Sequence, residues 1–237
     1  MNGFFIVKNP ARLSSGERTA AILAAVSIIV MALAALGAYG VIHGRLVVHG
    51  DGAATAGNIG AARGLFFMEI GLWMLIALTD AAAAIALWRF FALVDGKLSL
   101  VMAGSRILYS LSLIAGIVFL VRAAGSPDPL ESVGLFERLW SLGLIVFGLH
   151  LTLLAGISFK SGFVPGIWSW LLVAAGPSYA LIHSLKNLGP TFAPASAALE
   201  TFLSVPMTVA EVGFAVWLLV RGARGARAVS AIGEDAA

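Results

Sequence analysis

The sequence predicts an all-α fold, a polytopic bundle of six transmembrane helices with both termini in the cytoplasm. Of its 237 residues, 60% are hydrophobic and only 11% are charged, whereas about 25% of the residues of a soluble domain are charged. Six apolar stretches of about 20 residues, the length that crosses a bilayer as a helix, take up nearly the whole chain. One compact membrane bundle is therefore expected.

The first expected span follows a cytoplasmic segment, residues 1–19, that contains Lys8, Arg12 and Arg18. The span itself is longer than the apolar core of a signal peptide, which has about 7–15 residues. We therefore expect it to be retained. The chain then turns at Gly50-Asp51-Gly52, and the small polar residues after that turn predict a short surface helix outside the bilayer.

Polar or proline-containing loops separate the later spans. Pro127 and Pro129 end the third span, because neither can donate a helical hydrogen bond. Pro177 should kink or break the fifth span. The predicted spans are about residues 20–42, 64–91, 98–123, 139–159, 164–184 and 203–220; they form one membrane domain, residues 20–221, followed by a flexible basic tail, residues 222–237.

Lys and Arg residues collect at alternate ends of the spans, and they predict the orientation of the bundle. One side has Lys8, Arg12, Arg18, Arg89, Lys97, Lys160, Arg221, Arg224 and Arg227, and the other has Arg45, Arg63, Arg122, Arg138 and Lys186. Cytoplasmic loops have the excess of basic residues. The larger group therefore places both termini in the cytoplasm.

The composition also excludes several functional classes. The chain has no cysteine, which excludes disulfides, thiolate nucleophiles, cysteine-ligated iron–sulfur clusters and covalently attached haem. Its net charge of +3 comes from basic residues at helix ends, a pattern typical of membrane topology and anionic lipid rather than nucleic acid. We expect the lipid bilayer as a partner, no nucleic acid and no cofactor. Nothing in the sequence specifies an oligomeric state.

Two opposite charges lie inside neighbouring spans, Asp80 in the second and Arg106 in the third. Each costs about 2.5 to 3.5 kcal/mol at the centre of a membrane helix, so each needs a partner. Counted from the connecting loop at 1.5 Å per residue, Asp80 lies roughly 16 Å and Arg106 roughly 13 Å deep. The sequence therefore predicts that they form a buried ion pair.

Two more ionisable residues lie at a similar depth. His150 and Glu211 are each ten residues from the basic end of their span, hence roughly 15 Å deep. Tyr109 lies on the face of Arg106. Glu69 shares the face of Asp80 nearer the outside, where it is either an outer station of a polar path or solvated at the membrane edge. We therefore predict one polar cluster with contributions from four helices.

This cluster supports three hypotheses. The leading one is transporter-like or sensor-like handling of protons, ions or a small ligand in the bundle core, because ionisable groups within a membrane are functional by default. The alternative is an integral membrane enzyme that uses His150 with Asp80 or Glu211. The third is a structural subunit in which the Asp80–Arg106 pair only fixes helix packing.

Other polar and aromatic residues carry weaker predictions. No E-x-x-H or H-x-x-x-H spacing is present, so no metal site is expected, and His150 is expected to be packed and hydrogen-bonded. Tryptophans near the ends of spans are expected to anchor or pack the helices rather than to form a ligand cage. They are Trp88, Trp140, Trp168, Trp170 and Trp217.

Several short motifs occur in a recognisable order. They are Gly50-Asp51-Gly52-Ala53-Ala54-Thr55-Ala56, Asp80 with Ala86-Leu87-Trp88, Arg106, His150-Leu151, Lys160-Ser161-Gly162-Phe163-Val164-Pro165, and Glu211 with Trp217-Leu218-Leu219 and Gly222. Over residues 16–223 the chain resembles the bacterial membrane-protein family known as domain of unknown function 4386. Gly166 departs from the basic residue typical of that position.

The resemblance implies a prokaryotic integral membrane protein with six spans, located in the inner, or plasma, membrane of a bacterial cell. It implies no activity, because the family is uncharacterised. Asp80, Arg106, His150, Glu211, Tyr109 and Glu69 are therefore candidates for binding or proton handling on the physical argument alone.

Overall fold

The computed structural model describes the backbone of residues 13–234 and the side chains of residues 13–224. Within these residues every regular element is helical. The elements are α1 (Ser15–Ala35), the π-helical η1 (Leu36–His43), α2 (Gly44–Leu46), α3 (Gly52–Ala61), α4 (Arg63–Phe91), α5 (Gly96–Ala123), α6 (Leu130–Ser161), α7 (Gly166–Leu188), the 3-10 turn η2 (Pro190–Phe192) and α8 (Ala193–Glu234). The predicted all-α fold is confirmed.

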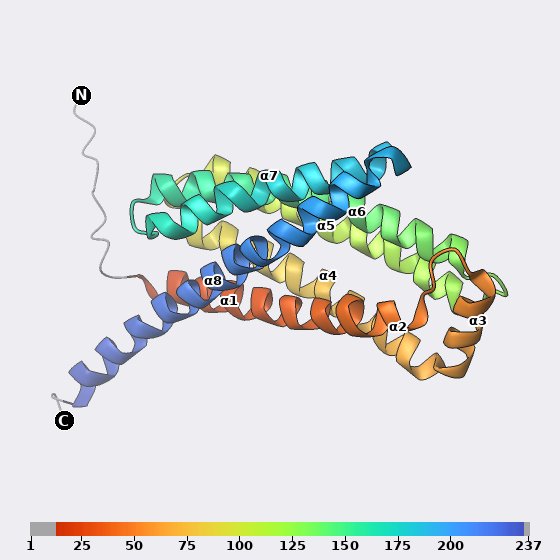
Figure 1. Ribbon diagram of the computed structural model, residues 1–237. Helices are drawn as coiled ribbons and strands as arrows, with labels where there is room; N and C mark the ends of the chain where they lie inside the picture. Colours follow the sequence, from red (N-terminus) through yellow and green to blue (C-terminus); the bar gives the residue numbers. More distant parts are fainter. Residues whose placement is uncertain (1–12, 235–237) are drawn as a thin grey trace.

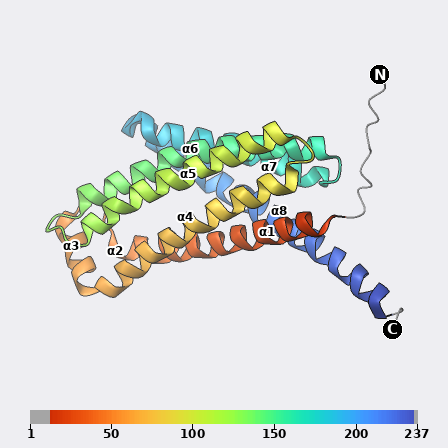
Figure 2. The same ribbon diagram turned by 180° about the vertical axis from the view of Figure 1, so that it is seen from behind.

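The long helices pack as a closed ring. The pairs in contact are α1 with α4, α4 with α5, α5 with α6, α6 with α7, α7 with α8, and α8 with α1. In Figure 1, α8 crosses in front between α7 and α1, and from behind α4 lies between α1 and α5 (Figure 2). Side chains that point into this ring therefore meet at a common centre.

The two ends of the bundle differ. One end, called the α3 end below, contains α3, the connection between α5 and α6, and the start of α8 (Figure 1). The start of α1 and the end of α8 lie at the opposite end. This arrangement follows from the alternating direction of the long helices, because each short connection reverses the chain.

Five helical segments are long and apolar enough to cross a membrane. They are Ser15–Leu46, Arg63–Phe91, Gly96–Ala123, Leu130–Ser161 and Pro190–Arg224. Large apolar side chains point outward from them, including Leu33, Val118 and Phe202 with 65%, 62% and 80% exposure. An apolar exterior of this kind matches a hydrocarbon environment. The chain is therefore a membrane protein, with α7 outside the group of five.

Polar side chains define where several helices begin. The Ser14 hydroxyl accepts a hydrogen bond from the backbone N–H of Glu17, whose carboxylate accepts from the Ser14 N–H in return. The Asp95 carboxylate accepts from the N–H groups of Leu98 and Lys97 at the start of α5. The Leu98 contact, with help from Lys160, lowers the pKa of the Asp95 carboxyl. These caps satisfy N–H groups that the helices leave unpaired.

Two helices extend beyond the expected spans. α6 begins at Leu130 rather than near residue 139, and α8 begins at Ala193 rather than near residue 203. Both additions are less apolar than the spans, so hydropathy did not detect them. Of the kink or break expected at Pro177, the break is wrong, because α7 is helical through that residue.

α6 and α7 approach closely where two glycines face each other. A Cβ added to Gly148 would lie 2.5 Å from the carbonyl oxygen of Gly176, and one added to Gly176 would lie 2.8 Å from the carbonyl oxygen of Gly148. Only hydrogen atoms fit between the two backbones here. Small residues permit such close helix contacts in membranes.

Candidate functional site

Asp80 and Arg106 form the predicted buried ion pair. The Arg106 Nη2 atom, on α5, contacts the Asp80 Oδ1 atom, on α4. The two side chains are 1% and 0% exposed, respectively. The prediction of a buried salt bridge is therefore confirmed.

His150, on α6, completes a closed cluster with this pair. Its Nδ1 atom lies 2.9 Å from the Met102 carbonyl oxygen, which can only accept, so Nδ1 carries the proton. Its Nε2 atom then accepts from Arg106 Nη1 at 3.1 Å. Both ring nitrogens are thus occupied, and His150 is the packed, hydrogen-bonded residue that the sequence suggested. We call Asp80, Arg106 and His150 the Arg106 cluster.

The Arg106 guanidinium also contacts residues outside this cluster. Its carbon lies 5.1 Å from the ring centroid of Phe147, a cation–π distance. Its Nη2 atom lies 3.4 Å from the sulfur of Met31 on α1. Arg106 therefore links α5 to α1, α4 and α6 across the ring.

Glu211, the fourth predicted member, is separate from the Arg106 cluster. It lies on α8 and is half-buried, and in the described part of the chain no ion pair joins it to a basic side chain. Arg106 acts on it at longer range, and its close polar neighbour is Tyr179 on α7. The structure thus brings three of the predicted residues into contact and leaves the fourth, Glu211, apart.

Glu211 lies where two cavities adjoin. The first, which we call the aromatic cavity, has a volume of about 120 Å³. Five aromatic residues, four aliphatic ones and Glu211 line it: Trp73, Tyr109, Trp140, Phe147 and Tyr179, then Met31, Ala35, Ile76 and Leu144, and Glu211. Tyr109, the fifth predicted candidate and predicted on the same face of α5 as Arg106, lies on the wall of this cavity.

The second cavity, which we call the lateral cavity, has a volume of about 460 Å³. Its walls come from α1, η1, α7 and α8 and include Ile28, Leu36, Tyr179, Thr208 and Glu211. Glu211 and Tyr179 belong to both cavities. The carboxyl group is thus reached from the centre of the ring and from the side where α8 meets α1.

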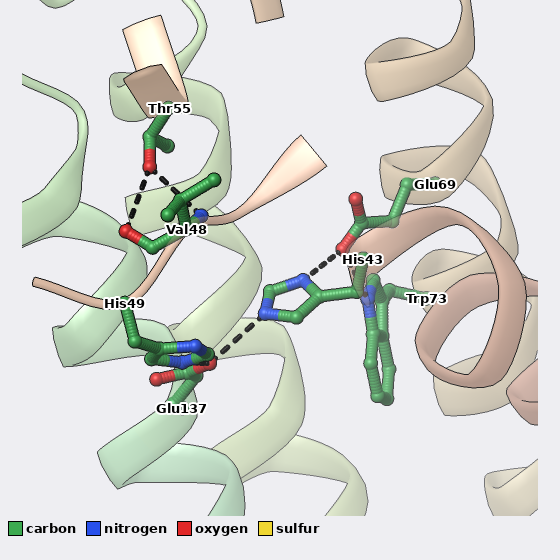
Figure 3. Close-up of polar contacts among 7 residues, drawn as sticks. All are labelled: His43, Val48, His49, Thr55, Glu69, Trp73 and Glu137. Carbon is green, nitrogen blue, oxygen red and sulfur yellow. Dashed lines mark hydrogen bonds and ion pairs between the residues drawn. The ribbon is translucent and has the colours of Figure 1, made fainter. Parts of the chain in front are cut away.

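A second polar cluster lies towards the α3 end (Figure 3). His43 bridges two acids, with Nδ1 2.6 Å from Glu69 Oε1 and Nε2 2.9 Å from Glu137 Oε1. His49 also contacts Glu137 Oε1 at 2.9 Å, and the Trp73 indole N–H donates to Glu69 Oε1 at 3.2 Å. We call His43, His49, Glu69 and Glu137 the His43 cluster.

Glu69 corrects one of the expectations. It is 0% exposed, so it is not solvated at a membrane edge. Its Oε2 atom is buried with no hydrogen-bond partner. The sequence placed Glu69 on the inner face correctly, but it gave no partner, because His43 comes from a different helix.

His43 was missed because of a local change of helix type. It ends η1, a π-helical segment that inserts extra residues per turn and so rotates the positions after it. Ordinary 3.6-residue periodicity from α1 therefore does not predict which way His43 points. The signal that was available is a histidine followed within 26 positions by an acid at the same end of the bundle.

A third cavity of about 510 Å³ lies beside the His43 cluster at the α3 end. Its polar lining includes His49, Glu137, Arg138, Ser141, His183 and Lys186. Trp140 lines both this α3-end cavity and the aromatic cavity. The α3-end cavity thus shares a wall residue, Trp140, with the aromatic cavity, which shares Tyr179 and Glu211 with the lateral cavity.

The candidate centre is composed of acids, histidines and aromatic rings. Among the described residues, no group of three or more His, Asp and Glu side chains is placed to hold a metal ion. What the arrangement offers chemically is a carboxyl group with access to two cavities, next to a charge-balanced ion pair.

Comparisons with known proteins identify a family and add no activity. The model of the family described as Domain of unknown function (DUF4386) matches residues 23–222. A relative from Archaeoglobus fulgidus, described as an uncharacterized protein, is 27% identical over 161 residues, which cover 68% of this chain and 87% of the relative. No solved structure matches the chain.

Proposed function

Because the chain belongs to the family described as Domain of unknown function (DUF4386), whose description names no activity, we propose its function from the site itself. We propose that this protein handles a proton or a small cationic ligand in the membrane, in a transporter-like or sensor-like role, with Glu211 as the exchanging group. The observation that carries the proposal is the position of Glu211 between two adjoining cavities.

The charge balance of the centre supports Glu211 in this role. Arg106 is already paired with Asp80, and His150 is held as a neutral acceptor. A second carboxylate in a low-dielectric centre then needs either a proton or a cation from outside the protein. Glu211 is the acid that has cavity space for one.

The Arg106 cluster fits a structural role better than a catalytic one. None of the three cavities described above is lined by Asp80, Arg106 or His150. A base with both nitrogens engaged has no lone pair to offer a substrate. These features support the hypothesis of a packing role for the pair, while leaving ligand handling to Glu211.

The topology that accompanies this proposal is a six-span protein in the bacterial inner membrane. α7 has 23 residues, hence a length of about 34 Å at 1.5 Å per residue, enough to cross the hydrocarbon core. It also completes the ring between α6 and α8. The excess of Lys and Arg at the end where α1 begins favours cytoplasmic termini.

The proposal is tested by labelling with dicyclohexylcarbodiimide, an apolar reagent that modifies protonated carboxyl groups. The purified full-length protein is treated in detergent micelles over a range of pH, and labelled peptides are identified by mass spectrometry. We expect Glu211 to be labelled, with slower labelling at higher pH as its proton is lost. We expect Asp80, which lines none of the cavities described, to stay unlabelled.

Two results contradict the proposal. One is a Glu211 that resists labelling at every pH while a free carboxylic acid in the same micelles reacts. The other is equal labelling of Asp80 and Glu211, which means that access does not distinguish them. The Glu211→Gln variant, whose amide cannot react, identifies the labelled site and serves as the control.

A further inference from the structure

The aromatic cavity combines two features that together identify a class of ligand. Its walls include the faces or edges of five aromatic rings, and its one acidic side chain is Glu211. Aromatic rings attract cations through the negative charge of their faces, most strongly when water is excluded. We propose that the aromatic cavity binds a small alkylammonium ion, with Glu211 as the counter-ion. This inference rests on the proposed function and names its ligand.

The rings are held in place by one another, so the cavity is built in advance of binding. The Trp73 and Trp140 rings meet edge-on with centroids 4.9 Å apart. Tyr109 packs on Phe147 at 5.1 Å, and Tyr179 meets Phe147 edge-on at 5.3 Å. Preformed walls reduce the ordering that binding requires.

Arg106 carries a positive charge that would repel a cation bound in the aromatic cavity. It lies over the Phe147 ring, so that face is already occupied. Its charge is balanced by Asp80, and neither residue lines the aromatic cavity. The rings left for a ligand are those of Trp73, Tyr109, Trp140 and Tyr179.

The size of the cavity favours a small headgroup. A volume of about 120 Å³ is well below the roughly 300–1,000 Å³ of pockets that hold drug-sized ligands. The side-chain oxygens on the walls are those of Glu211, Tyr109 and Tyr179, fewer than the roughly six or more oxygen ligands that Ca²⁺ or Mg²⁺ requires. A methylated ammonium group, whose charge is spread over an apolar surface, matches these walls.

The α3-end cavity provides a route to this site from water. It is polar, contains Glu137 and His49, and shares Trp140 with the aromatic cavity. Tyr39 packs against Trp140 with centroids 4.8 Å apart. The Tyr39–Trp140 contact therefore lies at the wall between the α3-end cavity and the aromatic cavity.

The test uses tetramethylammonium chloride as the probe and sodium chloride at equal ionic strength as the reference. Binding to the full-length protein in detergent is measured by titration calorimetry, and protection of Glu211 from dicyclohexylcarbodiimide is measured in parallel. We expect saturable binding and slower labelling of Glu211 with tetramethylammonium only. Glu211→Gln should weaken binding by about tenfold or more, the equivalent of about 1.4 kcal/mol.

Variants of the walls separate a cage from a nonspecific effect. Trp140→Leu should weaken tetramethylammonium binding, whereas Trp170→Leu should not, because Trp170 is 66% exposed and lines none of the cavities described. Tyr179→Phe keeps the ring and should bind, whereas Tyr179→Leu should bind weakly. Thermal unfolding of each variant shows whether it is folded. If Trp140→Leu does not fold, the comparison of Tyr179→Phe with Tyr179→Leu decides whether the aromatic cavity is the binding site.

The outcomes distinguish this inference from the proposed function. If Glu211 is labelled but tetramethylammonium neither binds nor protects it, the ligand class is wrong and exchange at Glu211 stands. If tetramethylammonium binds equally to wild type, Trp140→Leu and Tyr179→Leu, the aromatic cavity is not the site. If Glu211 cannot be labelled at all, the proposed function fails as well.

Discussion

At the scale of single residues, the same physical cost produces two different outcomes. Asp80 and Arg106 remove the cost of burying a charge by pairing with each other. Glu211 has only Tyr179 close by. The pair balances its charge within the protein, whereas Glu211 borders cavities that could supply a proton or a cation. Asp80 therefore fits a packing role and Glu211 a binding role, although in the sequence both are acids within an apolar span.

Removing one member of the Arg106–Asp80 pair should destabilise the protein strongly. Asp80→Asn leaves the guanidinium buried without its counter-charge, and breaking a buried pair costs about 3–5 kcal/mol. We expect a lower unfolding temperature in detergent for Asp80→Asn and for Arg106→Gln. The double variant should recover much of the loss, because no net charge is then buried.

The exposed pair of Lys160 and Asp95 provides the matched control. Lys160 Nζ lies 2.7 Å from Asp95 Oδ2, and the Lys160 side chain is 57% exposed. Surface pairs contribute about 0–1 kcal/mol, so Lys160→Gln should shift the unfolding temperature little. Equal effects of Asp80→Asn and Lys160→Gln would mean that the buried pair has no special role in stability.

At the scale of helices, the contact between α6 and α7 depends on two glycines. A methyl group at Gly148 would lie 2.5 Å from a backbone oxygen of α7, and a backbone cannot move aside without separating the helices. Gly156 lies on the same helix, and a Cβ there would meet nothing within 4 Å. The two positions therefore differ in packing while sharing their helix and residue type.

Gly148→Ala should destabilise the protein, whereas Gly156→Ala should not. Overpacking of this kind costs about 1–3 kcal/mol, and alanine otherwise favours a helix over glycine by about 1 kcal/mol. Thermal unfolding of both variants in one detergent measures the difference. A Gly148→Ala variant as stable as Gly156→Ala would show that α6 and α7 do not approach as closely as described.

Helix type also explains what hydropathy could and could not predict. The spans were predictable, because a bilayer requires long apolar helices. The π-helical turn that ends at His43 was not, because it produces no apolar signal of its own. The unbroken course of α7 through Pro177 was also not predictable, since a proline in a membrane helix can be accommodated by its neighbours.

At the scale of the whole molecule, the ring explains which parts of the site the sequence predicted. Neighbouring helices in the chain are neighbours in space, so the Asp80–Arg106 pair followed from depth along a single hairpin. The contact between α1 and α8 joins the two ends of the ring. Depth alone did not show that Glu211 would face a cavity at this contact rather than Arg106.

The proposed orientation of the ring can be tested directly, because the chain has no cysteine. Single cysteines can replace Lys97, at the start of α5, and Gly60, on α3; these two parts of the chain lie at opposite ends of the bundle (Figure 1). With cytoplasmic termini, a membrane-impermeant maleimide should label Gly60→Cys in spheroplasts and Lys97→Cys only in inside-out vesicles. The reverse pattern would invert the orientation, and labelling of both from one side would mean that α4, the helix between them, does not cross the membrane.

The order in which the ring is completed has a consequence for biogenesis. A ribosome releases helices in sequence, and α8 follows the other five long helices in the chain. Until α8 enters the bilayer, the earlier helices form an open arc with no wall between α7 and α1. Glu211 lies on α8 itself, so its carboxyl group enters the bilayer together with the helix that closes the ring. A partly inserted chain therefore never exposes Glu211 to lipid on both sides.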